Sequence, residues 1–224
     1  MALILNIDTA TETAGICLSR EGETLALFQH DEQKDHAAWL QPAIGKMMRE
    51  TGYNLSDLEA VAVTGGPGSY TGLRVGMATA KGLCYALQIP LIAANTLRVM
   101  ALAAMEQLPE WTGLLCPMID ARRMDVFTAV YQTDGVTRML PKAMTVEKGS
   151  FDEWLEQGEV SFFGGGSDKC KLVIQSIRAH FVQIRYHAGH LGILSFKLYL
   201  QGEFADTIYC EPAYTKEFYT HNRK

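Results

Sequence analysis

The sequence of 224 residues lacks several features that mark specialised classes of protein. Acidic residues outnumber basic ones by 25 to 20, and the resulting charge of −5 argues against a free-standing nucleic-acid-binding protein. No apolar run approaches the roughly 18–20 residues that a membrane-spanning helix requires. The opening MALILNID has neither a basic leader region nor a cleavage signal. We therefore expect a cytoplasmic protein that makes no use of a membrane.

Cysteine is scarce, odd in number and never arranged as a CxxC pair. The five cysteines are Cys17, Cys84, Cys116, Cys170 and Cys210. This pattern indicates reduced, packed thiols rather than a disulfide framework or a zinc site. His187 and His190 form the one close histidine pair, but no acidic HExxH partner accompanies them. We expect no metal site.

Strand and helix patterns alternate through the first hundred residues. We predict strands at 3–8, 15–19, 25–29, 60–64 and 91–93, and helices at 33–51, 71–87 and from Thr96 onward. The same order of elements then recurs. We predict further strands at 114–119, 125–131 and 160–163, a turn at Asp134-Gly135, and helices at 151–156, 168–177 and 190–200.

The duplicated pattern predicts an α/β protein of two packed lobes that face each other across a cleft. Residues 1–100 form the N-terminal lobe, with a glycine-rich loop and two long helices. Residues 101–224 form a smaller C-terminal lobe with the final helix and tail, and the segment Asn95–Pro109 contains the boundary. We expect a mixed sheet with helices in each lobe.

A glycine-rich loop, TGGPGSYTG from Thr64 to Gly72, joins a predicted strand to a predicted helix. The free N–H groups and positive dipole of a helix N-terminus attract anions, so the loop is a candidate phosphate site. It matches neither a Walker A motif nor GxGxxG. The alternative is a turn that only caps the helix, with Ser69 or Thr71 as N-cap, and local sequence does not separate the two interpretations.

A second candidate follows the first strand, where Asp8 is succeeded by the hydroxyl-rich run TATET. An acid at a strand end suits a metal–phosphate site, but aspartate is also a common turn former. Local sequence favours the structural interpretation.

The helix after the glycine loop carries two rows of small residues. One row is Gly72, Gly76 and Ala80, and the other is Ala78, Gly82 and Ala86. Each interior glycine costs about 1 kcal/mol relative to alanine, so close approach by another element must offset the loss. Together with the apolar stripe that includes Met47 and Met48 on the preceding helix, the rows indicate either a helical docking surface or ordinary core.

Several stretches taken together resemble a known family. They are IDTATETAGICLS, GGPGSYTGLRVG followed by AKGL, PLIAANTL, IDARRMDVF and EPAYTK. In this order they resemble the TsaB (YeaZ) family, a glycoprotease-like family related to TsaD, over residues 3–216.

The resemblance implies an actin-like ATPase (ribonuclease H-like) fold. It also implies a scaffold role in the bacterial complex that installs threonylcarbamoyl on the adenosine next to the anticodon of tRNAs reading codons that begin with adenine. The implied partners are the catalytic paralogue TsaD and the ATPase TsaE, with tRNA contacted only through the complex. A homodimer is implied when the chain is alone. No resident cofactor is implied, and a nucleotide at a partner interface stays open.

The resemblance also assigns roles to residues. Relics of phosphate-binding loops are Asp8, Thr9, Thr11, Gly66, Gly68, Ser69 and Gly165. The partner interface consists of Leu40, Ile44, Met47 and Met48 on the first helix, and Arg74, Val75, Gly76, Ala78, Thr79, Lys81, Gly82 and Tyr85 on the second.

One departure from TsaD bears on catalysis. TsaD carries the metal-binding motif Asn-His-xxx-His, whereas Thr96 and Met100 stand at the matching positions here. Neither side chain supplies an imidazole ligand. We therefore expect a pseudo-enzyme with no catalytic residue and no metal. The alternatives are an independent ATP-binding phosphotransferase or ATPase, which would use Asp8 and the glycine loops, and a metallopeptidase.

Overall fold

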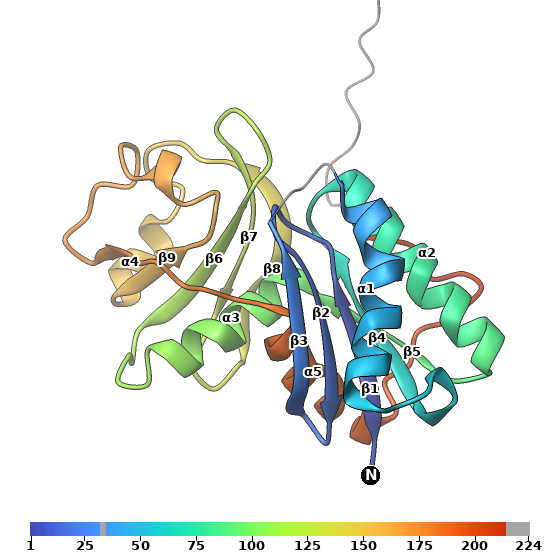
Figure 1. Cartoon of the computed structure of the whole chain (residues 1–224). Helices are drawn as coiled ribbons and strands as arrows, with labels where there is room; N and C mark the ends of the chain where they lie inside the picture. The colour runs from blue at the N-terminus through green and yellow to red at the C-terminus, as the bar shows by residue number, and fades with distance from the viewer. Residues whose placement is uncertain (32–34, 214–224) are drawn as a thin grey trace, which may run out of the picture.

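Two five-stranded mixed sheets form two lobes in the computed structural model, which describes residues 1–31 and 35–213 (Figure 1). The first sheet has the order β3-β2-β1-β4-β5. Its strands are β1 (Leu3–Asp8), β2 (Ala14–Arg20), β3 (Glu23–His30), β4 (Ala60–Gly66) and β5 (Leu91–Asn95). The second sheet has the order β10-β9-β6-β7-β8. Its strands are β6 (Leu114–Asp120), β7 (Asp125–Tyr131), β8 (Thr137–Thr145), β9 (Val160–Phe163) and β10 (Ala179–Phe181).

The two sheets repeat one topology. In each, three consecutive strands pair antiparallel, a fourth strand pairs parallel with the first of them, and a fifth pairs parallel with the fourth. The predicted duplication and the predicted α/β class are confirmed. The turns at Gly22 and Gly135, both at positive φ, close the two β-hairpins as expected.

Helices cover both faces of the first sheet, which is why β1 reads as a continuous apolar run. Leu5 and Ile7 face α1 (His36–Thr51) and α2 (Tyr70–Leu87), while Ile4 and Ala62 face α5 (Ala188–Gln201) and α3 (Thr96–Gln107). This alternation has the period of two expected for a strand. All six residues of β1 are buried.

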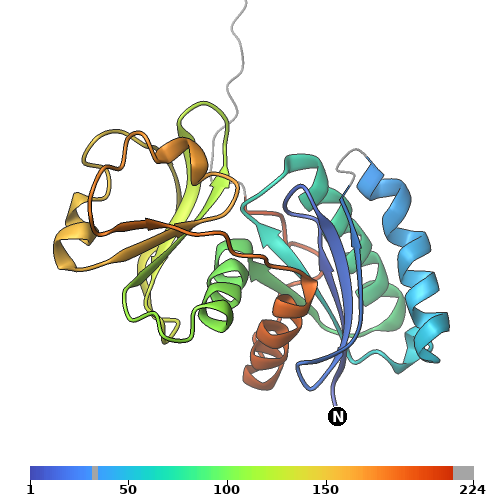
Figure 2. The same cartoon turned by 60° about the vertical axis from the view of Figure 1, so that its left-hand side comes forward.

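Helix α5 packs on the first sheet although it is the last helix of the described chain and follows the strands of the second lobe (Figure 2). Ser195 in this helix donates a buried hydrogen bond of 2.6 Å to the side chain of Asn6 in β1. The sequence placed the final helix in the C-terminal lobe, and this placement is wrong because its apolar face fits the uncovered side of β1 and β2. The division near residue 100 stays a prediction.

The second lobe carries less helix than the first. Between its strands lie α4 (Asp152–Gln157) and the 3-10 helix η3 (Asp168–Cys170); a further 3-10 helix, η2 (Leu55–Asp57), belongs to the first lobe. The predicted helix over 168–177 is wrong beyond this single turn. Cys170 and Ile174 are buried in the core of the second lobe, but Leu172 and Ile177 are 84% and 96% exposed, and the chain between Cys170 and β10 forms only turns and irregular structure.

The first long helix begins at His36, and the start predicted at Gln33 lies outside the described residues. The other predicted strands and helices are confirmed to within a few residues at their ends.

Candidate functional site

A cleft of about 1750 Å³ separates the lobes at the ends of β1 and β6. On the first-lobe side it is lined by the loop after β1 and the start of α2. On the second-lobe side it is lined by the turn between β6 and β7 and by Gly164 and Gly165. The segment 184–188, which crosses from the second lobe to α5, lines the cleft between these two walls.

Asp8 is the buried acid of this cleft. Its carboxylate is 3% exposed, and its Oδ1 accepts hydrogen bonds from the Ala10 amide at 3.0 Å and the Thr64 hydroxyl at 2.9 Å. Burial raises the pKa of Asp8 to about 6, against the opposing effect of the two hydrogen bonds. A carboxyl group that titrates near neutral pH in a cleft can hold a proton or a cation.

The glycine-rich loop packs against the chain that follows β1. A Cβ at Gly68 would lie 2.2 Å from the Ala10 carbonyl oxygen, and the Ser69 amide donates to that same oxygen at 2.7 Å. The Ser69 side chain accepts from the Gly72 amide and is the N-cap of α2. These contacts favour the helix-capping interpretation over the phosphate loop, because the Ser69 amide is already paired with a protein carbonyl.

Five of the seven predicted phosphate-loop residues line the cleft. They are Asp8, Thr11, Gly68, Ser69 and Gly165. Thr9 does not, because its buried hydroxyl donates to the Gly72 carbonyl at 2.7 Å. Gly66 does not either, because it is buried under Ala213, whose oxygen would lie 2.9 Å from a Cβ there. For these two residues the structure contradicts a place in the ligand cleft.

The second-lobe wall holds residues that sequence reasoning did not select. Arg122 and Arg123 both have positive φ, at 68° and 46°, in the exposed turn between β6 and β7. The Arg122 amide donates to Asp120 at 2.8 Å, and Lys169 pairs with the same carboxylate, which lowers the pKa of Asp120 despite some burial. Left-handed residues are usually glycine or asparagine, so two arginines gave no signal in the sequence.

The positions that match the metal-binding histidines of TsaD lie in packed surroundings. Thr96 is fully buried, and the methyl group of Met100 would lie 2.5 Å from a Cβ at Gly164. A hydroxyl and a thioether do not provide the imidazole ligands of that site. In residues 1–31 and 35–213, no group of three or more His, Cys, Asp or Glu is placed to hold a metal ion.

The apolar stripe of α1 serves the protein's own core. Leu40, Ile44, Met47 and Met48 are all buried against the first sheet and α2. Their assignment to a partner interface is wrong for this reason: a partner docking on the folded chain would not reach them.

The two small-residue rows of α2 face opposite ways. Gly76 is buried, and a Cβ there would lie 2.3 Å from the Thr9 hydroxyl, so its assignment to a partner surface is also wrong. Ala78 and Gly82 are exposed, and a Cβ at Gly82 would meet nothing within 4 Å. One row of small residues therefore belongs to the core, and the other lies on an open surface where another helix could dock.

The remaining predicted interface residues border that open surface. Arg74 and Tyr85 are exposed, and Val75, Thr79 and Lys81 are partly buried. Tyr85 is 74% exposed. The Arg74 guanidinium stacks on Tyr70 with 3.9 Å to the ring centroid. Lys81 donates to the carbonyl oxygens of Ile208 and Cys210 at 3.0 and 2.9 Å, which ties the segment after α5 to α2.

Helices long and apolar enough to cross a membrane are absent from the part of the chain that the structure describes.

Comparisons with known proteins agree with this architecture. The family model described as TsaD, tRNA N6-adenosine threonylcarbamoyltransferase, matches residues 30–186. The tRNA threonylcarbamoyladenosine biosynthesis protein TsaB of Bacillus subtilis is 32% identical over 177 residues, which cover 78% of this chain and 76% of that protein.

Solved structures extend the likeness to nearly the whole chain. An uncharacterized protein with similarity to peptidase YEAZ from Pseudomonas aeruginosa is 26% identical, with a TM-score of 0.83 over 96% of this chain and 100% of that one. The inorganic polyphosphate/ATP-glucomannokinase from Arthrobacter sp. strain KM is 13% identical, with a TM-score of 0.52 over 89% and 100% of the two chains, and shows the fold alone. The two-lobed actin-like ATPase fold is confirmed. The chain belongs to the TsaB (YeaZ) family of tRNA threonylcarbamoyladenosine biosynthesis proteins, which is related to TsaD.

Proposed function

We propose that this chain is a non-catalytic scaffold subunit of the machinery that adds threonylcarbamoyl to the adenosine beside the tRNA anticodon. The observation that carries the proposal is the open row Ala78, Gly82 and Ala86 on α2, which nothing in the described chain covers. Glycine in an exposed helix interior weakens the helix, so a surface that keeps it gains from the close approach of another helix.

The partner that we propose for this surface is TsaD, the catalytic paralogue, acting with the ATPase TsaE. Small side chains allow two helices to approach to the short end of the usual 8–10 Å range, and Tyr85 and Arg74 flank the row with larger groups. In the absence of TsaD a second copy of this chain would occupy the same surface. The net charge of −5 supports indirect contact with tRNA, through the complex.

The residues of the cleft favour a non-catalytic role for this chain. Met100 and Thr96 replace the ligand set of the TsaD metal, and the Ser69 amide of the glycine loop pairs with Ala10. We therefore propose that the chain works without a resident metal or cofactor. All five cysteines are free thiols, which supports a place in the reducing cytoplasm.

The test is co-purification with TsaD and TsaE after co-expression. Gly82→Trp and Ala78→Trp place a large side chain on the open row without touching the core, and each should reduce TsaD recovery by at least tenfold. Ile193→Trp, on the exposed side of α5 across the first sheet, is the matched control and should co-purify normally. Full recovery of TsaD with both row variants would reject the proposed surface.

A second candidate function is ATP binding or hydrolysis by the isolated chain. It is favoured by Asp8, the buried acid at the end of β1 in the cleft. Turnover of ATP by the purified chain that falls at least tenfold in Asp8→Asn would support it. No turnover in the absence of TsaD, combined with tRNA modification when both are present, would support the scaffold.

A further inference from the structure

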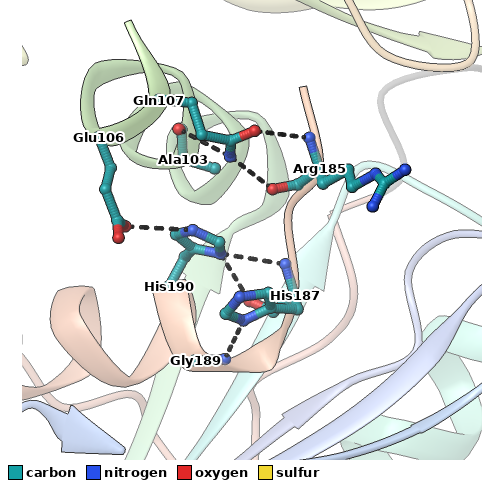
Figure 3. A network of polar contacts seen from close by, with 7 residues as sticks. All are labelled: Ala103, Glu106, Gln107, Arg185, His187, Gly189 and His190. Carbon is teal, nitrogen blue, oxygen red and sulfur yellow. Dashed lines mark hydrogen bonds and ion pairs between the residues drawn. The ribbon is translucent and has the colours of Figure 1, made fainter. Parts of the chain in front are cut away.

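The joint between the lobes contains an unusual set of hydrogen bonds to the crossover segment 185–189 (Figure 3). Three backbone N–H groups of this short stretch donate to side chains rather than to backbone carbonyls. The Arg185 amide donates to Gln107 Oε1 at 3.1 Å, the His187 amide to His190 Nδ1 at 3.1 Å, and the Gly189 amide to His187 Nδ1 at 3.1 Å.

Two of these three acceptors are imidazole nitrogens. His190 Nδ1 also lies 3.3 Å from the His187 carbonyl oxygen, and it accepts from the His187 amide in the tautomer that carries its hydrogen on Nε2. An Nδ1 that accepts a hydrogen bond must carry a lone pair, so its ring is neutral with the hydrogen on Nε2. The other nitrogen of His190 faces Glu106 Oε2 at 3.3 Å, consistent with an Nε2–H donor. Together the two rings form a reciprocal capping box at the start of α5.

The crossover is fixed to α3 on the same side. Gln107 Nε2 donates to the Arg185 carbonyl at 2.6 Å, so its amide group engages both the N–H and the C=O of that residue. Glu106, one residue earlier in α3, holds His190. The crossover, α3 and α5 thus meet in one polar cluster between the two lobes, and Arg185 and His187 also line the cleft.

The charged and titratable groups around the two rings come from two neighbouring elements. Helix α3 contributes Glu106, and the crossover contributes Arg185, whose side chain points away from the rings in Figure 3, and Tyr186. Strands β2 and β3 present neutral groups to this end of α5, the backbone at Gly15 and the hydroxyl of Thr24.

We propose that the His187–His190 pair is a proton-sensitive latch on the joint between the lobes. When either ring gains a second proton, its Nδ1 becomes a donor and can no longer accept the facing backbone N–H. The capping box then opens, because protonation of one ring removes one of the three side-chain acceptors and protonation of both rings removes two. The remaining Gln107 contacts hold only Arg185, so the first turn of α5 loses its side-chain caps and the wall of the cleft loosens.

The latch is closed at neutral pH. Burial lowers the pKa of both rings, and the neighbouring His190 lowers the pKa of His187 further, while Glu106 acts in the opposite direction. Protonation therefore requires a pH below the usual value for histidine, and the latch opens on the acidic side.

Hydrogen exchange measured by mass spectrometry on the full chain tests the latch directly. After correction for intrinsic exchange rates, protection of a peptide covering residues 185–190 should fall at least tenfold between pH 7.5 and pH 5. A peptide from the buried strand β1 should stay protected, which separates local opening from unfolding.

A non-titrating pair of variants sharpens the test. His187→Asn and His190→Gln combined keep acceptors for both backbone N–H groups but remove the titration, so protection should become independent of pH. His180→Gln removes the partly exposed histidine that pairs with Glu159 in the second lobe, and it should respond as the wild type does. His187→Ala should show low protection already at pH 7.5.

Two results would overturn the latch. One is a wild-type peptide with equal protection at both pH values. The other is a double variant that still loses protection in acid to the same extent as the wild type. Either result would show that the capping imidazoles do not control the joint.

Discussion

Both faces of α2 carry small residues, but the inner face packs against the sheet whereas the outer face is open. On the inner face Gly76 lets the helix lie directly on Thr9 and Val63, while on the outer face Gly82 has open space where a Cβ would be. Residue type alone therefore does not indicate whether a glycine in a helix allows close packing inside the protein or leaves an open surface. What distinguishes the two faces is whether the protein's own sheet already fills the space that the missing side chain leaves.

The largest expected effect is on the inner face. Gly76→Ala places a methyl group 2.3 Å from the Thr9 hydroxyl oxygen, and α2 must move away from the sheet to accommodate it. We expect a loss of about 3 kcal/mol in the free energy of unfolding, the upper end of the cost of overpacking a core. Urea denaturation of wild type and variant measures it, and a loss below about 0.5 kcal/mol would contradict the close contact.

The second-largest expected effect is on Asp8, at the end of strand β1 beneath this inner face, where substitution should raise rather than lower the free energy of unfolding. Its pKa is about 6 in the folded chain against 3.8 as the ordinary value, so the folded state binds the proton more tightly. The contribution of Asp8 to stability therefore falls as pH rises from about 4 to 6, and it stays low above that. Asp8→Asn should stabilise the protein by about 2 kcal/mol at pH 7.

The measurement for Asp8 is the difference in unfolding free energy between wild type and Asp8→Asn across pH 3.5–7.5. This difference should grow as pH rises through the window and then level off. A constant difference, or a variant that is less stable at pH 7, would mean that the carboxylate is stabilised by its surroundings rather than strained by burial.

Gly82→Ala gives the matched contrast to Gly76→Ala, because the same substitution falls on the outer face. With nothing within 4 Å of the new Cβ, the higher helix propensity of alanine should add about 0.8 kcal/mol to stability. Thermal and urea unfolding both report this gain. A loss of stability would show that the outer face is covered in the free protein, for example by a second copy, and dilution would then restore the gain.

The smallest expected effect concerns the segment that Lys81 holds beside the outer face. Lys81→Met removes two hydrogen bonds to the carbonyls of Ile208 and Cys210 while keeping much of the aliphatic stem. Because the side chain is only partly buried, we expect a loss of about 0.5 kcal/mol. The clearer readout is hydrogen exchange, which should become faster around residues 205–210 and stay unchanged in α1.

Local patterns predicted most of the fold. The buried strand β1, the turn glycines 22 and 135, and the Ser69 cap were all visible, because each depends on residues adjacent in sequence. The final helix was placed on the wrong lobe, because contacts between residues distant in sequence, such as the Asn6–Ser195 hydrogen bond and the packing of Leu191 on Ile4, decide its position. The same limit applies to the segment 168–177, which buries Cys170 and Ile174 but leaves Leu172 and Ile177 exposed.

The candidate site was predicted less well, for a related reason. Asp8 and the glycine loop were noticed because each follows a predicted strand, and the family resemblance, rather than local sequence, assigned them to phosphate-binding loops. The two arginines at positive φ, the Tyr186–Thr11 contact and the capping imidazoles were missed, because conformation and partners rather than composition define them. The apolar stripe of α1 was misassigned since core and interface draw on the same side chains.

The return of α5 to the first sheet has a consequence for biosynthesis. A ribosome that has released only residues 1–110 has made all five strands of that sheet, yet one side of β1 and β2 still waits for a helix about eighty residues further on. During that interval, which lasts several seconds at ordinary elongation rates, the apolar side of the sheet is exposed to solvent and can bind chaperones or aggregate. Premature termination before residue 188 should thus yield an aggregating fragment rather than a stable half-molecule.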